Sequence, residues 1–441
     1  MKDFLEKTFK LSDNKTTIRT ELLAGLTTFL TMAYIIIVDP QILSTTGMPI
    51  NAVLFATILV SAVSSIFFGF YANLPIALSV GMGLNAFFAF TLCGSMGVSW
   101  QTGLAAVFIS GIIFVILSLT GVREMIINAI PKSLKYSIAI GIGFFLALIG
   151  LKSVEFIVSN PATVVSFGGI NLTVVLFIVA LIFTIVLEIK KVRGAFVISI
   201  LVTSAVAWIL SQFVSKEVMG ASYIQLPESL LSLPQFDTVL ALDLKSALTV
   251  GMIMPIFTFL FTSLFDGIST LVGVCEAAGL NDEKGNPKNM KKALLADSLS
   301  GVFAGLVGNS TGTAYVESAA GVQQGGRTGL TAVVVGLLFI PFIFFGNLVG
   351  VIPTVATAPV LVIIGVFMLQ PVKKIDWTNM EDAIPAFLAI FLIPFTYSIT
   401  QGIVWGFLSY TLIKLCLGKF KDIHPMLYII DILAIVALLE L

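Results

Sequence analysis

The sequence predicts an all-α polytopic membrane protein with about fourteen transmembrane segments, arranged as a 7+7 inverted repeat. Three observations support this fold class. The 441-residue chain is 58% hydrophobic and only 11% charged, with a mean hydropathy of +1.06. Apolar runs follow one another along the chain, and its two halves repeat residues in the same order. Soluble domains carry about 25% charged residues, so the composition excludes a soluble globular protein.

Charge and residue usage narrow the function classes. The chain has 24 basic and 24 acidic residues, so no overall field attracts nucleic acid, and no nucleic-acid partner is expected. A single histidine, His424, and three scattered cysteines cannot form a dedicated zinc site or a disulfide framework. No Walker A sequence is present, so ATP is not expected to drive the protein. We therefore expect neither an enzyme nor a resident cofactor.

The spans follow from bilayer thickness, because a crossing helix needs about 20 apolar residues. The first half has runs near 21–43, 52–72, 83–98, 103–120, 133–151, 171–188 and 194–213. After a polar stretch at about 215–246, the second half has runs near 248–274, 293–308, 313–324, 328–346, 351–370, 383–399 and 401–417. The last apolar stretch, 426–441, carries two acidic residues and predicts an interfacial or packing helix, with a fifteenth span as the alternative.

Basic residues predict the orientation of the chain. Those in alternate loops are Arg123 and Lys132, then Lys190, Lys191 and Arg193, then Lys284, Lys288, Lys291 and Lys292, then Arg327, Lys373, Lys374, Lys419 and Lys421. The opposite loops are nearly free of basic residues, apart from Lys152 and the central loop. By the positive-inside rule, both termini are expected in the cytoplasm, in a chain embedded in the cell membrane.

The two halves share residues at a slowly drifting offset. Ser64, Phe67, Gly69 and Asn73 recur as Ser300, Phe303, Gly305 and Asn309; Gly103 recurs as Gly329; and Ile130, Pro131 and Gly143 recur as Ile352, Pro353 and Gly365. Because each half contains an odd number of spans, the second half must be inverted relative to the first. Inverted repeats are typical of secondary transporters, whose site lies near the midplane between the repeats.

The third and tenth spans are predicted to be broken. Both segments, 73–98 and 309–327, are rich in glycine, serine or threonine, and the second is too short to cross as one helix. A short extended segment followed by a half-helix would cross, with the half-helices beginning near Asn85 and Glu317. The alternative is that these glycines only allow close helix packing.

Three carboxyl groups lie deep in the apolar runs, namely those of Asp266, Asp297 and Glu317. An intramembrane carboxylate is costly, so Asp266 and Glu317 are functional candidates, whereas Asp297 is as readily structural as functional. Asp39, by contrast, lies at a span end and is expected to be solvated, as are Glu188 and Glu276.

These features predict a secondary transporter for a small polar solute, coupled to a cation through carboxylates. Because burial favours the neutral form of a carboxyl group, Asp266 or Glu317 could carry a proton, with Asp297 a weaker candidate. The residues leave open which of them does so. They also leave open a sodium ion, held by backbone carbonyls near Gly81 and Gly312. A channel or a membrane-embedded enzyme is the alternative from another class.

Four motifs carry a resemblance to a known family: TFLTMAY at 28–34, GMGLNAF at 81–87, LFD at 264–266 with Thr270 and Leu271, and YVESAAG at 315–321. With them, the sequence from about residue 10 onward resembles the azaguanine-type purine permeases of the nucleobase–ascorbate transporter group. The resemblance implies proton-coupled uptake of guanine and hypoxanthine, or of adenine, often by homodimers. Xanthine, uracil and inorganic anions are alternative substrates on the same fold.

The resemblance also implies a core domain of spans 1–4 and 8–11 and a gate domain of spans 5–7 and 12–14. The corresponding boundaries are 1–125 and 247–347 for the core, 126–215 and 348–418 for the gate, 216–246 for an extracellular connecting loop, and 419–441 for a hydrophobic tail.

The substrate-binding residues implied by the resemblance come from three spans. They are Asn85, Ala86 and Phe87 of the third, Ser263 and Asp266 of the eighth, and Val316, Glu317 and Ser318 of the tenth. Ser263 stands where the motif usually has an aspartate, and residues 267–269 read Gly-Ile-Ser where threonine and glycine are more usual. This departure leaves the preferred base open, and also whether Asp266 alone serves the eighth span.

Overall fold

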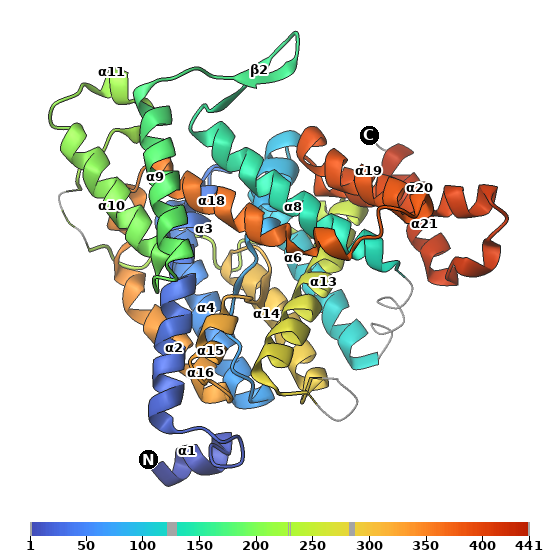
Figure 1. Ribbon diagram of the computed structural model, residues 1–441, viewed down its shortest axis with the longest axis horizontal. Coiled ribbons are helices and arrows are strands. Elements are labelled where there is room, and N and C mark those ends of the chain that lie inside the picture. Colours follow the sequence, from blue (N-terminus) through green and yellow to red (C-terminus); the bar gives the residue numbers. More distant parts are fainter. Residues whose placement is uncertain (1, 121–129, 228, 230, 282–286, 440–441) are drawn as a thin grey trace. The chain divides into compact units, whose positions relative to one another are not determined.

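The computed structural model describes residues 2–120, 130–227, 229, 231–281 and 287–439 (Figure 1). They form two compact units. Unit 1 comprises the described residues of Met1–Gly121, Pro227–Leu248 and Phe259–Gly350. Unit 2 comprises those of Val122–Leu226, Thr249–Thr258 and Val351–Leu441. Each unit therefore draws on both halves of the sequence.

Unit 1 contains helices from both halves and one small sheet. Its first-half elements are α1 (Lys2–Phe9), α2 (Ile18–Met32), α3 (Ile35–Ser44), α4 (Ile50–Ala72), β1 (Leu78–Val80), α5 (Met82–Ala86), the π-helix η1 (Phe87–Ser95) and α6 (Trp100–Thr120). Its second-half elements are α12 (Leu244–Ala247), the part of α13 (Ile253–Ala278) from residue 259 onward, α14 (Met290–Val307), β4 (Gly312–Ala314), α15 (Ser318–Gln323), α16 (Gly329–Phe339), the 3-10 helix η4 (Ile340–Phe344) and α17 (Gly346–Gly350).

Unit 2 contains the remaining helices and a β-hairpin. Its first-half elements are α8 (Lys132–Ser153), β2 (Ile157–Asn160), β3 (Val164–Phe167), α9 (Leu172–Ile189), α10 (Ala195–Leu210), α11 (Lys216–Met219) and η2 (Gly220–Ser222). Its second-half elements are η3 (Val250–Met252), α18 (Thr354–Met368), η5 (Gln370–Lys374), α19 (Met380–Thr396), α20 (Ile399–Cys416), η6 (Phe420–Asp422) and α21 (Pro425–Leu439).

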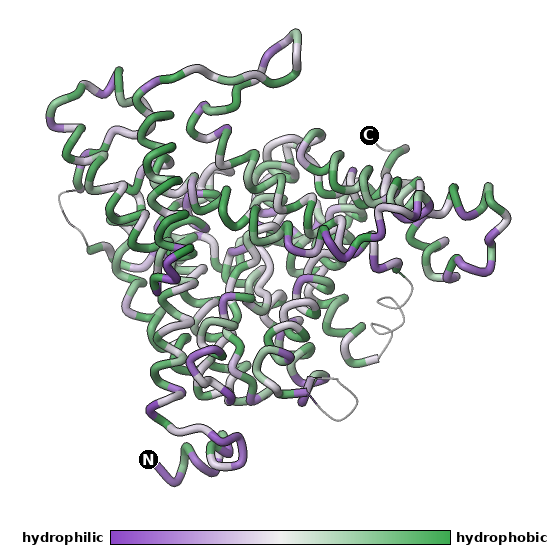
Figure 2. The backbone as a smooth tube through the Cα atoms, in the orientation of Figure 1, coloured by the Kyte–Doolittle hydropathy of each residue, from purple (hydrophilic) through white to green (hydrophobic). Residues whose placement is uncertain are grey.

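The predicted apolar runs fall on these elements. In the described part of the chain, eight helical segments are long and apolar enough to cross a membrane, and three shorter apolar ones lie at Met82–Ser95, Ala195–Leu210 and Gly329–Phe344. Figure 2 shows hydrophobic residues along most of the helices. Arg123 and Lys284, two of the basic residues that predict the orientation, lie outside the described residues, so the orientation stays a prediction.

A two-stranded antiparallel sheet joins the two repeats inside unit 1. Leu78 of β1 pairs with Ala314 of β4, and Val80 pairs with Gly312. Because Ser79 and Thr313 face each other at the centre, the pairing is symmetric about them, as a two-fold axis between the repeats requires. These strands lie where the sequence predicts extended segments. Helix α5 begins at Met82 after β1, and α15 begins at Ser318 after β4. That these segments are broken membrane spans stays a prediction.

Residues that match between the repeats also touch each other. The Ser300 hydroxyl donates a hydrogen bond to the Ser64 hydroxyl at 2.8 Å, across 236 residues of sequence. In unit 2, Gly143 of α8 and Gly365 of α18 lie against each other's backbone carbonyls. A residue that contacts the matching residue of the other repeat must lie close to the axis that relates the two repeats. Each unit therefore contains packing contacts between matched positions of the two repeats.

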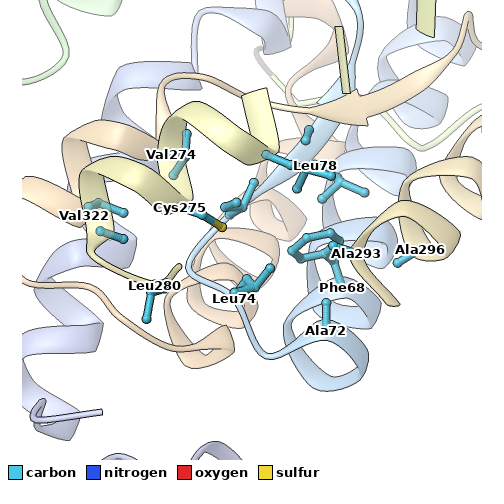
Figure 3. Packing of buried hydrophobic residues seen from close by; sticks show 14 residues of the cluster. Phe68, Ala72, Leu74, Leu78, Val274, Cys275, Leu280, Ala293, Ala296 and Val322 are labelled. Carbon is cyan, nitrogen blue, oxygen red and sulfur yellow. The ribbon is translucent and has the colours of Figure 1, made fainter. Parts of the chain in front are cut away.

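A buried apolar cluster supports the sheet in unit 1. Phe68 and Ala72 of α4, Leu78 of β1 and Cys275 of α13 belong to it (Figure 3). Figure 3 also shows Val274, Leu280, Ala293, Ala296 and Val322 around them. Because these side chains come from five elements, the cluster holds the sheet against helices of both repeats.

The turn that follows α15 is held by a carboxylate from α2. Glu21, fully buried, accepts a hydrogen bond from the Arg327 amide at 2.8 Å. It also accepts from the amide of Thr331 at 3.2 Å and from its hydroxyl at 2.6 Å. Glu21 therefore ties the Arg327 amide, just before α16, to Thr331 in the first turn of that helix.

Close approach of α4 and α16 gives a first testable prediction. A Cβ atom on Gly329 would overlap the Gly69 carbonyl group, which is backbone and cannot move aside. Gly329→Ala is therefore expected to cost about 1–3 kcal/mol of stability, the usual cost of overpacking, seen as a lower melting temperature in detergent. Gly273→Ala is the matched control because nothing lies within 4 Å of its added Cβ atom. Equal melting temperatures for the two variants would contradict the prediction.

Candidate functional site

Glu317 lies at the start of the short helix α15 and is half-buried. Its Oε1 atom accepts a hydrogen bond of 2.8 Å from the hydroxyl of Tyr34, which is itself buried at the start of α3. Tyr34 therefore orients the Glu317 carboxylate. Tyr34 belongs to the motif at 28–34 but is not among the predicted site residues.

Tyr315 lies beside Glu317 and links it to the sheet. Its hydroxyl donates a hydrogen bond to the backbone carbonyl of Val80, and its amide donates to the carbonyl of Ala77 at 3.0 Å. The same side chain interacts electrostatically with the carboxyl groups of Glu317, Asp39 and Asp266. Three carboxyl groups from three different helical segments thus lie within electrostatic range of one tyrosine.

Asp266 lies near the middle of α13 and is exposed. The next residue, Gly267, packs against the Asp297 carboxylate so closely that a Cβ atom at this position would overlap it. Asp297 is buried and accepts a hydrogen bond of 2.9 Å from the Ala314 amide. The structure therefore gives Asp297 a role in anchoring β4, while Asp266 stays accessible.

The predicted third-span residues are all fully buried. The Asn85 amide nitrogen donates to the Asp39 carboxylate, and its oxygen accepts from the Ser310 hydroxyl. Ala86 follows within the core, and the Phe87 ring packs edge-on against Phe259 at 5.0 Å. In this structure the polar atoms of Asn85 bind other protein groups.

The remaining predicted site residues differ in how far their side chains are exposed. Val316 is 59% exposed beside Glu317, whereas Ser318 is fully buried and its hydroxyl accepts from the Ala77 amide at 3.0 Å. Ser263 of α13 is 5% exposed, and its hydroxyl has no hydrogen-bond partner among the described residues. The accessible predicted residues are thus Asp266, Val316 and Glu317.

The expectation that the Asp39 side chain is solvated at a span end is wrong. Asp39 is fully buried, and accepts hydrogen bonds from Thr57, Asn85 and Asn309. The reason is that α2 ends at Met32 and the separate helix α3 packs against α4 and α5. A carboxylate inside the run Ile35–Leu43 is itself a signal of function, and it could have identified Asp39.

No group of three or more histidine, cysteine, aspartate or glutamate side chains in the described part of the chain could hold a metal ion. The chemistry on offer is instead that of carboxylates and hydroxyls, which accept and donate hydrogen bonds and bind protons. Two accessible carboxylates beside an apolar side chain suit a neutral polar solute.

Comparison with known proteins identifies the family. Residues 19–405 match the model of the Permease family, Xan_ur_permease. The chain belongs to this permease family. The adenine permease AdeP of Escherichia coli (strain K12) is 42% identical over 433 residues, which cover 98% of this chain and 95% of AdeP. The guanine/hypoxanthine permease PbuO of Bacillus subtilis (strain 168) is 39% identical over 98% of this chain and 99% of PbuO.

A solved structure confirms the fold of this permease. The transmembrane domain of the cyanobacterium bicarbonate transporter BicA superposes with a TM-score of 0.63 at 14% identity, covering 88% of this chain and 97% of that domain. The predicted fold class, a 7+7 inverted repeat of membrane helices, is therefore confirmed, as is the resemblance to nucleobase permeases. The chain is an integral membrane transporter and not an enzyme.

Proposed function

We propose that this permease imports purine nucleobases, guanine or hypoxanthine, by proton symport. The observation that carries the proposal is the pair of accessible carboxylates, Asp266 and Glu317, both within electrostatic range of Tyr315, in a chain whose relatives include guanine/hypoxanthine permeases over nearly their full length. Guanine and hypoxanthine are neutral planar rings with N–H donors on one edge. An ionised carboxylate accepts two such donors side by side.

In the proposed site the base contacts the accessible residues first. Asp266 and Glu317 accept its N–H groups, and Val316 packs against the ring. The Tyr34 hydroxyl keeps Glu317 in the orientation that accepts. One of the two carboxyl groups also takes up the coupled proton, since a carboxyl group can bind a proton as well as accept a hydrogen bond.

We further propose that transport proceeds by alternating access between a core and a gate domain. The two compact units support this division: unit 1 holds most of spans 1–4 and 8–11, and unit 2 holds spans 5–7 and 12–14. Homodimerisation, which the resemblance implies, belongs to the same proposal. Determination of the mass of the detergent-solubilised protein tests it.

Adenine is the second candidate substrate. Two adenine permeases of Escherichia coli (strain K12), AdeP and AdeQ, are each 42% identical to this chain, slightly above PbuO. Uptake of labelled guanine, hypoxanthine and adenine into cells that lack their own purine permeases separates the two candidates. Saturable uptake of adenine alone would replace the guanine/hypoxanthine proposal, and uptake of none of the three would refute both.

The proposed topology gives a second prediction. In a background without Cys93, Cys275 and Cys416, Lys190→Cys and Lys373→Cys are expected to react with an impermeant maleimide only from the cytoplasmic side. Thr163→Cys, in the exposed turn between β2 and β3, is expected to react only from outside. Labelling of Lys190→Cys or Lys373→Cys from outside would overturn the fourteen-span count.

A further inference from the structure

A second polar cluster lies inside unit 1, and the proposed mechanism does not use it. We define the Asp39 cluster as Asp39, Thr57, Asn85, Asn309 and Ser310, all of them fully buried. The Thr57 hydroxyl donates to Asp39 Oδ2 at 2.5 Å and Asn309 Nδ2 donates to it at 2.8 Å. Asn85 Nδ2 donates to Oδ1, and its own oxygen accepts from Ser310. One carboxylate therefore collects three donors.

The donors come from segments far apart in sequence. Thr57 belongs to α4, Asn85 to α5 of the first repeat, and Asn309 to the segment that leads into β4 of the second repeat. Ser61 of α4 extends the cluster to β1 through a hydrogen bond of 2.6 Å to Ser79. Since the cluster is buried, loss of one partner leaves another polar group unsatisfied, which is costly.

Helix α3 connects this cluster to the proposed site. Tyr34, which donates to Glu317, lies at its start, and Asp39 lies five residues further along. Five residues of helix rise about 7.5 Å, so α3 and its N-cap link the backbone positions of Tyr34 and Asp39 directly. Displacement of Asp39 would therefore move the Tyr34 hydroxyl relative to Glu317.

We propose that Asp39 is a positioning residue for transport. By accepting from Asn85 and Asn309, it holds α5 and the β4 segment together, and through α3 it sets the place of Tyr34 and hence of Glu317. The proposal rests on the proposed function for its effect on uptake. It also assigns Asn85 a role in this cluster, without contact to the base.

If Asp39 acts in this way, the cluster requires an acceptor at one of positions 39 and 309 and a donor at the other. Exchanging the two residue types should therefore preserve the hydrogen bond between them. In Asp39→Asn, the new amide NH2 group would face the NH2 group of Asn309 or of Asn85, and two donors cannot bond to each other. In Asn309→Asp, two carboxylates would lie within hydrogen-bond distance. In the double variant Asp39→Asn/Asn309→Asp, the amide at position 39 accepts from Asn85 and donates to the carboxylate at position 309. The Thr57 hydroxyl, which donates to Asp39 Oδ2 and lies 3.0 Å from Asn309 Nδ2 in the wild type, can then donate to the carboxylate at position 309.

The experiment compares the two single variants, the double variant and the wild type. Uptake of labelled guanine, hypoxanthine and adenine is measured per folded molecule, with the folded fraction determined by fluorescence-detected size exclusion. Each single variant is expected to lower uptake about tenfold, and the double variant to restore it to within about threefold, because the two substitutions are strongly coupled. Asp376→Asn, at an exposed aspartate, is the matched control and is expected to behave as wild type.

Hydrogen–deuterium exchange of the purified protein supplies a readout without substrate. Amides of 78–87 and 312–317 are expected to exchange faster in the single variants and at the wild-type rate in the double variant. Wild-type uptake per folded molecule in both single variants, or a double variant no better than either, would overturn the proposal. If the wild type itself takes up no purine, the proposed function fails, and unchanged exchange in the single variants would overturn the positioning role separately.

Discussion

Glu317→Gln is expected to abolish concentrative uptake of purines while the protein still folds and reaches the membrane. Glutamine keeps the size of the side chain and can still accept from the Tyr34 hydroxyl. It replaces one acceptor oxygen with a donor, however, and it cannot bind a proton at physiological pH. Loss of one hydrogen bond to a charged group costs about 2–3 kcal/mol, or roughly 30- to 150-fold in affinity.

The measurement is accumulation of labelled guanine and hypoxanthine against a gradient, normalised to the amount of folded transporter. Glu276→Gln is the matched control, because Glu276 lies near the end of α13 and is exposed. It is expected to transport as wild type. Accumulation by Glu317→Gln at the wild-type level would remove Glu317 from both binding and coupling, and would leave Asp266 as the carboxylate to test next.

Uptake is also expected to stop when a protonophore is added and to continue without sodium. The physical reason is that the carboxyl groups of the proposed base site could bind a proton and the base together, which would couple their movement. The expectation that the coupling ion is a proton and not sodium rests on the family resemblance. Purines are expected to compete strongly, and uracil hardly at all, because a fused bicyclic ring buries more area against Val316 and its neighbours than a single ring does.

These measurements test the coupling ion and the substrate class separately. Uptake that survives the protonophore and collapses without sodium would overturn the coupling and leave the site residues in place. Strong competition by uracil would overturn the substrate class instead. Both are initial-rate measurements in cells that lack their own purine permeases, with the untransformed cells as the background control.

Hydropathy predicted the apolar membrane helices because such a helix needs about 20 predominantly apolar residues in a row, which is a property of the local sequence. The repeat was likewise visible, and Ser64 and Ser300 show why it matters: matched residues near a two-fold axis meet each other. Asp266 and Glu317 could be predicted as candidates, because a carboxylate in an apolar run is costly wherever it points.

Asp39, Tyr34 and Asn309 could not be placed in the same way. Each makes its contact with residues remote in sequence: Tyr34 with Glu317, and both Asp39 and Asn309 with the same buried cluster. No window along the chain contains both partners. The apolar run around Asp39 signals that its carboxylate is costly, but no sequence pattern shows which three donors it receives inside the fold.

The sequence by itself therefore determined the class of protein, the repeat, and Asp266 and Glu317 as candidate carboxylates, since each of these is a property of composition or of local spacing. Only the tertiary structure decided which polar groups face each other. It placed Asn85 in a buried cluster with Asp39, gave Asp297 the Ala314 amide, and left Asp266, Val316 and Glu317 accessible. The physical reason is that a hydrogen bond depends on the distance and direction between two atoms, and those are set by how α3, the β1–β4 sheet and the neighbouring helices pack.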